Sequence, residues 1–259
     1  MPQTISVLGS GWLGFPLIKR LIAMNQYTLK ASCRSLDKYH QLAALEVDAF
    51  QFDIEEDQAL DDRFFSSETL IVNIPSRGLD GYKALVDKIS ASNIKRVILV
   101  STTSVYLDDK EIVTESDDVD TSSVRYQIEQ TFEKQSAFDT LTLRFAGLIG
   151  PNRHPGRFFK PGRVVANAQA PVNMLHLDDG IGIILAALNK PSLSGVLNCC
   201  SDTHPTKHHF YSQACAQLGA TPPEFHQADG VKGKIVCNTK VKQQLDYCFS
   251  HPDLMQITF

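Results

Sequence analysis

The sequence predicts an α/β fold, a doubly wound parallel sheet followed by a small C-terminal lobe. Short apolar runs alternate with segments of helical period up to Arg144. A glycine-rich loop follows the first of these runs, and the alternation loosens after Arg144. Strands that alternate with helices in this way favour a parallel sheet covered by helices on both faces.

The elements expected from this pattern fall into a main domain, residues 1–147, and a partly interleaved lobe, residues 148–259. The main domain is predicted to contain strands at 5–8, 28–32, 48–52, 70–74, 97–101 and 140–144. Helices are expected between them at 12–24, 35–46, 81–90 and 122–135, with Ser35 as the N-cap of the second. The lobe is predicted to contain helices at 178–189 and 206–218 and strands at 196–200 and 234–237.

Composition excludes several functional classes. The chain has 259 residues, and its 25 Lys and Arg are outnumbered by 29 Asp and Glu, so no nucleic-acid partner is expected. No apolar stretch is long enough to cross a bilayer and the N-terminus has no leader pattern, so we expect a cytoplasmic protein with no membrane partner. The six cysteines form no C-x-x-C pair, which predicts reduced thiols and neither a zinc knuckle nor a disulfide framework.

The most informative motif is a glycine-rich loop directly after the first predicted strand and before a predicted helix. Its six residues, all predicted to contact a dinucleotide, are Gly9-Ser10-Gly11-Trp12-Leu13-Gly14. In this context Gly9 makes a tight turn, Gly11 lets the backbone approach a pyrophosphate, and Gly14 allows close packing of helix on strand. The helix N-terminus adds free N–H groups. A glycine-rich turn without a ligand is the alternative, but the context favours NAD(P) binding.

The end of the second predicted strand indicates which dinucleotide is preferred. An acidic residue there would bind the ribose 2′-hydroxyl of NAD, but the chain has Arg34, with Ser32 and Ser35 nearby. A guanidinium suits the 2′-phosphate, so NADP is expected and NAD is the alternative. Arg34 as a solvated surface side chain is the other interpretation.

Four further residues complete the predicted cofactor site. Asp53 and Ile54 follow the third strand, where they either border the adenine or form a simple loop. Ile74 and Ser101 stand at the ends of the fourth and fifth strands.

Other motifs resemble a known family. The glycine loop together with Ser101-Thr102-Thr103-Ser104-Val105-Tyr106 resembles the extended short-chain dehydrogenase/reductases, the group of nucleotide-sugar epimerases and dehydratases. Three later segments, at 143–151, 153–158 and 172–179, resemble the YeeZ-like proteins of that NAD-dependent epimerase/dehydratase family. The resemblance implies a Rossmann fold that binds NAD(P), oxidoreductase or epimerase chemistry, and a homodimer as a common assembly.

The same resemblance implies which residues are catalytic, and it shows that this chain departs from the family's catalytic motif. Thr102, four residues before the tyrosine of the Val-Tyr pair, would lie beside the substrate; a threonine bonded to local backbone is the alternative. Family members carry Tyr-x-x-x-Lys on the next helix, where lysine lowers the tyrosine pKa. Here Tyr126 is followed four residues later by Gln130, and the register that places Arg125 at the lysine position offers Thr121 instead of tyrosine. Tyr126 is the remaining candidate proton donor.

Candidate substrate residues lie after Arg144. Arg153, His154 and Arg157 share a glycine- and proline-rich loop that suits an anionic group. A solvated basic loop, or an ion pair with the acidic stretch 108–120, is the alternative. His176 is a further candidate, although a structural histidine at a helix start is favoured. His204, His208 and His209 lack the spacing of a metal site, so no metal is expected.

The sequence thus predicts an NADP(H)-dependent oxidoreductase or epimerase acting on a small anionic substrate. The alternative is a non-catalytic NADP(H)-binding sensor or regulatory protein that lacks the Tyr-x-x-x-Lys pair.

Overall fold

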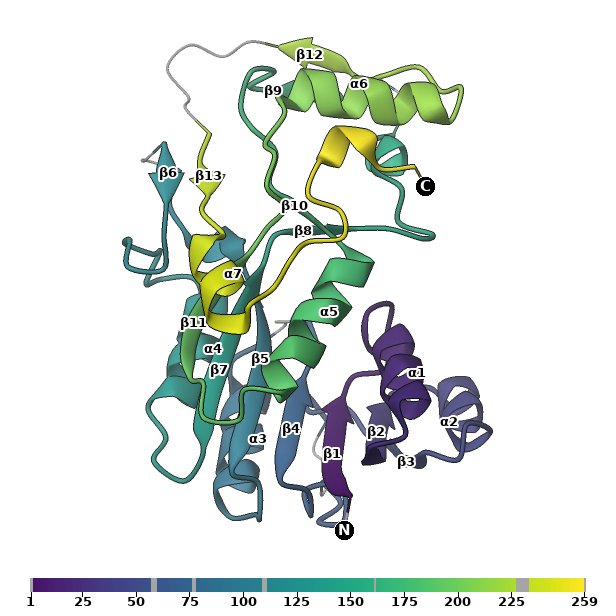
Figure 1. The fold of residues 1–259 in the computed structure, drawn as a ribbon, viewed down its shortest axis with the longest axis vertical. Helices are drawn as coiled ribbons and strands as arrows, with labels where there is room; N and C mark the ends of the chain where they lie inside the picture. The colour runs from purple at the N-terminus through teal and green to yellow at the C-terminus, as the bar shows by residue number, and fades with distance from the viewer. Residues whose placement is uncertain are drawn as a thin grey trace. The chain divides into compact units, whose positions relative to one another are not determined.

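A seven-stranded sheet dominates the computed structural model, which describes residues 2–56, 60–75, 78–108, 111–160, 162–226 and 233–258. Its strands are β1 (Gln3–Leu8), β2 (Tyr27–Cys33), β3 (Asp48–Gln51), β4 (Thr69–Val72), β5 (Arg96–Thr102), β7 (Asp139–Phe145) and β11 (Gly195–Cys199). They are ordered β11-β7-β5-β4-β1-β2-β3, as Figure 1 shows. The pairs β3–β2, β2–β1, β1–β4 and β4–β5 are parallel.

This strand order reverses between β1 and β4, because the chain moves outward to β2 and β3 and then returns to the other side of β1. Such a reversal defines a doubly wound sheet, and ligands bind outside the carboxyl ends of the strands at that point. The predicted fold class, a doubly wound parallel α/β sheet of Rossmann type, is therefore confirmed.

Four helices accompany these strands: α1 (Gly14–Met24), α2 (Leu36–Ala43), α3 (Asp80–Ser90) and α4 (Val124–Glu133). Each falls within a residue or two of its predicted start, and the predicted N-cap is confirmed, since Lys38 N–H donates to Ser35 Oγ at 3.3 Å. The predicted strand 70–74 instead ends at Val72. Asn73, Ile74 and Pro75 are thereby released from the sheet into the turn that follows β4.

The larger hydrophobic core lies between one face of the sheet and helices α3 and α4. Its strand members alternate along each strand, as Leu70 and Val72 do in β4, because alternate side chains share a face. Phe64 is fully buried at its centre, with edge-on contacts to Phe50, Phe52 and Phe65 at centroid distances of 5.1–5.4 Å. Ile5 and Val7 are buried on the opposite face of β1 from Leu8, and α1 contacts β1 and β2.

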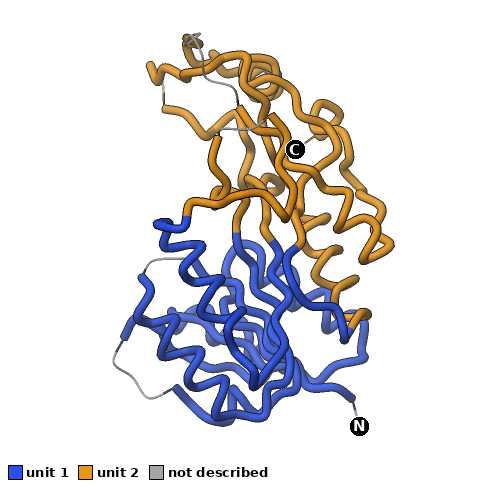
Figure 2. The backbone as a smooth tube through the Cα atoms, turned by 90° about the vertical axis from the view of Figure 1, so that its left-hand side faces the viewer, with its two compact units in different colours: residues 1–101, 121–143, 191–196 blue, residues 102–120, 144–190, 197–259 orange. Residues whose placement is uncertain are grey.

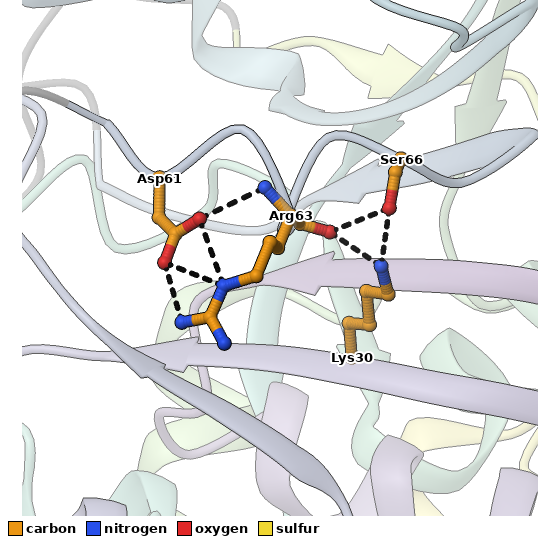
Figure 3. A network of polar contacts seen from close by, with 4 residues as sticks. All are labelled: Lys30, Asp61, Arg63 and Ser66. Carbon is orange, nitrogen blue, oxygen red and sulfur yellow. Dashed lines mark hydrogen bonds and ion pairs between the residues drawn. The ribbon is translucent and has the colours of Figure 1, made fainter.

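A polar network fastens the loop before β4 to strand β2, as Figure 3 shows. The Lys30 ammonium donates to Ser66 Oγ at 2.6 Å and to the carbonyl oxygen of Arg63. Asp61 accepts from the Arg63 guanidinium at 2.7 Å, and that hydrogen bond lowers the pKa of the Asp61 carboxyl. The loop that carries Phe64 and Phe65 into the core is therefore held from its solvent side as well.

The chain divides into two compact units, which Figure 2 distinguishes by colour. Unit 1 comprises residues 1–101, 121–143 and 191–196, and unit 2 comprises residues 102–120, 144–190 and 197–259. Unit 2 contains helices α5 (Leu177–Leu188), α6 (Lys207–Gln217) and α7 (Thr239–Leu245). Its own core gathers Ile149, Val172, Phe210 and Leu254.

Three short parallel strand pairs in unit 2 were not predicted as pairs. They join β10 (Met174–His176) to β8 (Gly147–Ile149), β12 (Glu224–His226) to β9 (Val164–Ala166), and β13 (Ile235–Val236) to β6 (Ile112–Val113). Of these strands the sequence indicated only β13. Strands of two or three residues are too short to display the alternation by which strands are recognised.

Candidate functional site

The glycine loop joins β1 to α1 at the carboxyl edge of the sheet. Leu8 ends β1, and α1 begins at Gly14 with Leu13 in the N-cap position, where it offers no side-chain oxygen to the helix. Because the first N–H groups of a helix have no partners within the helix, an uncapped N-terminus suits an anionic ligand.

Glycine occupies each of the three positions of the loop for a different physical reason. Gly9 has φ +100°, and a Cβ there would lie 2.4 Å from the carbonyl oxygen of Asn73. A Cβ on Gly14 would lie 1.9 Å from the carbonyl oxygen of Gly9, so only glycine lets the helix start this close to the strand. A Cβ on Gly11, in contrast, meets no atom within 4 Å. Gly9 and Gly14 are required by the fold, whereas the space over Gly11 is left open.

Two serine hydroxyls, one beside this loop and one within it, differ in their hydrogen bonding. Ser32, buried at the end of β2, accepts the Gly9 N–H at 3.1 Å through its Oγ and so holds the turn in place. Ser10 is also buried, yet its Oγ has no hydrogen-bond partner within the described ranges. A buried hydroxyl without a partner costs free energy unless a ligand or water supplies one. The site therefore fits a polar ligand at Ser10.

A cavity of about 290 Å³ opens beside the loop. It lies at the ends of β1, β2 and β4, where the strand order reverses, and all of its lining belongs to unit 1. Eight of the predicted cofactor residues line it, namely Gly9, Ser10, Gly11, Arg34, Ser35, Asp53, Ile54 and Ile74. Trp12, Leu13, Gly14 and Ser101 do not appear among its lining residues.

The cavity is lined by two cations, Arg34 and Lys38, and by two carboxylates, Asp53 and Glu55, of which Asp53 is paired with Arg34. Arg34 contacts Asp53 at 3.4 Å, and the Arg34 side chain is 53% exposed. Such an exposed pair is worth little and can be exchanged for a ligand contact. Asp53 also accepts the Glu55 N–H at 3.2 Å, which fixes the turn after β3.

Lys38 is a cavity residue that the sequence analysis missed. It lies in the first turn of α2, with its ammonium 4.0 Å from the centroid of the Phe15 ring and 2.6 Å from Gln41 Oε1. Its position three residues after the N-cap Ser35 is the signal that could have found it, since that spacing brings a side chain back over the helix start. Asp37, its acidic neighbour in the same turn, does not line the cavity.

Ser101, another predicted cofactor residue outside the cavity lining, makes a hydrogen bond within the protein. Ser101, near the end of β5, donates through its Oγ at 2.5 Å to Glu129, a buried carboxylate on α4. This hydrogen bond joins strand and helix, so the Ser101 hydroxyl has a structural partner of its own.

The two candidate catalytic residues fall in different units. Thr102 caps the short 3₁₀ helix Thr103–Val105, since its Oγ1 accepts the Ser104 N–H at 3.2 Å. This is the local backbone bonding that the sequence left as an alternative. Tyr126 lies half-buried in the first turn of α4, and Gln130, at the position of the family's lysine, donates to Glu133 of the same helix. Roles for Thr102 and Tyr126 in catalysis stay predictions.

The four candidate substrate residues lie in unit 2. Arg153 and Arg157 are exposed on one loop. His154 between them is buried, which lowers its pKa, and its Nδ1 accepts the Gly156 N–H at 3.0 Å. His176 is also buried, and its Nδ1 accepts the Asp178 N–H at 3.3 Å at the start of α5. Both histidines therefore cap local turns, while both arginines are exposed residues.

None of the helices in the described parts of the chain combines the length and the apolar character that crossing a bilayer requires.

The strand reversal, the glycine loop and the cavity beside it define a dinucleotide-binding protein. The chain belongs to the NAD(P)H-binding family, whose sequence profile matches residues 9–171. It is 30% identical to Protein YeeZ of Escherichia coli K12 over 268 residues, which cover 97% of each chain. The resemblance to the YeeZ-like proteins and the expected binding of NAD(P) by this family are confirmed.

Solved structures share the fold at lower identity. A functionally unknown conserved protein from Silicibacter pomeroyi has a TM-score of 0.80 and 22% identity, over 98% of this chain and 95% of that one. The UDP-glucuronic acid 4-epimerase of Bacillus cereus, solved in complex with NAD, has a TM-score of 0.78 and 18% identity, over 96% and 94% of the two chains. At these identities the likeness shows the fold alone.

The glycine geometry generates a prediction that separates binding from folding. Gly11→Ala fills space that no protein atom occupies, so we expect little change in the free energy of unfolding but at least tenfold weaker binding of NADP⁺. Gly14→Ala is the matched control, because its methyl meets backbone, and we expect it to cost about 1–3 kcal/mol of stability as overpacking does. Urea unfolding followed by Trp12 fluorescence and a fluorescence titration with NADPH measure the two quantities. Unaltered nucleotide affinity in folded Gly11→Ala would contradict this assignment of the loop.

Proposed function

We propose that this protein is an NADP(H)-dependent oxidoreductase or epimerase that acts on a small anionic substrate. When bound, the nicotinamide cofactor supplies a site that takes up or delivers hydride. The observation that carries the cofactor part is the cavity at the strand reversal, open over Gly11 and rimmed by Arg34 and Lys38.

Different residues of the chain would bind the pyrophosphate and the 2′-phosphate of the dinucleotide. The open backbone at Gly11 and the uncapped start of α1 would hold the pyrophosphate, and the unpartnered Ser10 hydroxyl would donate to one of its oxygens. The α2 start at Ser35, with Arg34 and Lys38 beside it, would hold the 2′-phosphate.

Charge at the rim is the reason for preferring NADP over NAD. An NAD site needs a free carboxylate after β2, but that position carries Arg34, and the nearby Asp53 is paired with it. A 2′-phosphate would compete with Asp53 for the guanidinium and gain the Lys38 ammonium as a second cation.

This preference predicts how two variants behave. Arg34→Ala and Lys38→Ala should each weaken NADP⁺ binding by about tenfold, the loss of one charge-assisted hydrogen bond at a partly exposed site, and leave NAD⁺ affinity within twofold. Lys19→Ala is the matched control, because Lys19 also lies over the Phe15 ring, at 4.9 Å, without lining the cavity. Calorimetric titration of wild type and variants with both nucleotides measures this. Equal affinity of wild type for NAD⁺ and NADP⁺ would refute the preference.

Substrate binding and proton transfer are assigned to residues that the sequence singled out. Arg153 and Arg157, exposed on one loop, would bind the anionic group of the substrate. Thr102 would orient the reacting oxygen through its hydroxyl, and Tyr126 would exchange the proton.

A second candidate function is a non-catalytic NADP(H)-binding sensor. The observation that favours it is the residue four places after Tyr126, where Gln130 replaces lysine and is bonded to Glu133. A neutral amide cannot stabilise a tyrosinate by charge, so the standard proton transfer of the family has lost its electrostatic support.

Turnover distinguishes the two candidates. The enzyme proposal expects NADPH oxidation with at least one member of a panel of small carboxylated or phosphorylated carbonyl compounds, falling about 100-fold or more in Tyr126→Phe. Tyr27→Phe, a half-buried tyrosine outside the cavity, serves as the control. Saturable NADPH binding with no oxidation across the panel would instead support the sensor, and turnover that survives Tyr126→Phe would remove this tyrosine from the mechanism.

A further inference from the structure

Three side chains that commonly bind metals meet in unit 2 at the start of α5. His176, Asp178 and His251 each offer one ligand atom, and these atoms lie within 4.8 Å of one another. Asp178 Oδ2 is 3.5 Å from His176 Nδ1 and 3.4 Å from His251 Nε2. Ligand atoms of a tetrahedral zinc site with bonds of 2.0–2.1 Å stand about 3.3 Å apart. The two measured separations therefore fit ligands that share one ion.

The backbone that carries His251 is fixed by a buried carboxylate. Asp179 is fully buried, and it accepts the Ser250 N–H at 2.7 Å, the His251 N–H at 2.9 Å and the Tyr247 hydroxyl at 3.0 Å. These bonds dock the C-terminal segment on the first turn of α5. His251 is thereby held beside His176, with a distance of 3.8 Å between the ring centroids.

The three ligands differ in exposure in a way that leaves one side of the cluster open. The His176 side chain is 7% exposed, that of His251 is 30% exposed, and that of Asp178 is 65% exposed. The buried His176 and the half-buried His251, whose backbone Asp179 fixes, give defined positions, while the exposed carboxylate leaves room for water to complete a coordination sphere.

The same atoms already interact without a metal. His176 Nδ1 accepts the Asp178 N–H at 3.3 Å, and the Asp178 carboxylate contacts both rings. An ion bound through His176 Nδ1 takes the lone pair that this long hydrogen bond uses. The bond at the helix start would be exchanged for a bond to the metal.

We propose that His176, Asp178 and His251 bind a divalent transition metal, with Zn²⁺ as the probe of choice. Two imidazole nitrogens and one carboxylate oxygen suit zinc and its neighbours, whereas Mg²⁺ and Ca²⁺ prefer oxygen ligands throughout. The ion would connect His251 to Asp178, 73 residues earlier in the chain, and so stabilise unit 2. This site is independent of the nucleotide, since none of its residues lines the cavity.

The test uses the full chain without a polyhistidine tag, first stripped with a chelator. Calorimetric titration with ZnCl₂ is expected to give a stoichiometry of one ion per chain. Thermal unfolding is expected to show a higher Tm with ZnCl₂ than without it. Asp178→Asn and His251→Gln should each weaken binding at least tenfold, and His209→Gln, an exposed histidine outside the cluster, should leave it unchanged. Circular dichroism checks that each variant folds.

The absorption spectrum of bound Co²⁺ distinguishes a metal on these three residues from a metal on cysteine. CoCl₂ bound at two histidines and one aspartate gives ligand-field bands without the intense near-ultraviolet band of a cobalt–thiolate bond. A thiolate band would place the metal on cysteines such as Cys237 or Cys248 and overturn the proposal. Absence of stoichiometric zinc binding to wild type, or zinc affinity unaltered in both folded variants, would overturn it equally. Should a variant not fold, the wild-type stoichiometry and the cobalt spectrum still decide.

Discussion

The close approach of the β1–α1 turn to the end of β4 is the constraint on which the rest of the site depends. A methyl group on Gly9 would meet the Asn73 carbonyl at 2.4 Å, and one on Gly14 would meet the Gly9 carbonyl at 1.9 Å. The turn is thus packed backbone against backbone, with Ser32 accepting the Gly9 N–H from the adjacent strand. This packing places Gly9, Ser10 and Gly11 in the lining of the cavity and leaves the space above Gly11 open.

The charged residues that line the cavity determine which ligands the open space above Gly11 would favour. The chain as a whole carries a net charge of −4, so no long-range field attracts an anion. Locally, Arg34, Lys38 and the start of α2 line the cavity, where Asp53 is paired with Arg34 and Glu55 is the second carboxylate. In the function proposed above, these few charges beside the glycine loop make an anion site in an acidic protein.

Much of the fold and part of the site could be predicted from the sequence, because their signals are local. Helical and strand periods, the Ser35 cap and the glycine loop each fit within a few residues. The contacts that escaped prediction join distant positions: Ser32 with Gly9, Ser101 with Glu129, and His176 with His251. Nothing in the residues near each partner indicates the other. Lys38 was missed for a different reason, since its importance follows from the geometry of the cap before it.

A crystal structure of the protein soaked with NADP⁺ would show whether the cavity holds the dinucleotide with its 2′-phosphate at the start of α2, as we propose. We predict the pyrophosphate over Gly11 and 2′-phosphate oxygens about 3 Å from the Arg34 guanidinium and the Lys38 ammonium, with the Arg34–Asp53 contact opened. A 2′-phosphate directed into solvent while Arg34 stays on Asp53, or a dinucleotide bound away from the glycine loop, would contradict this proposal.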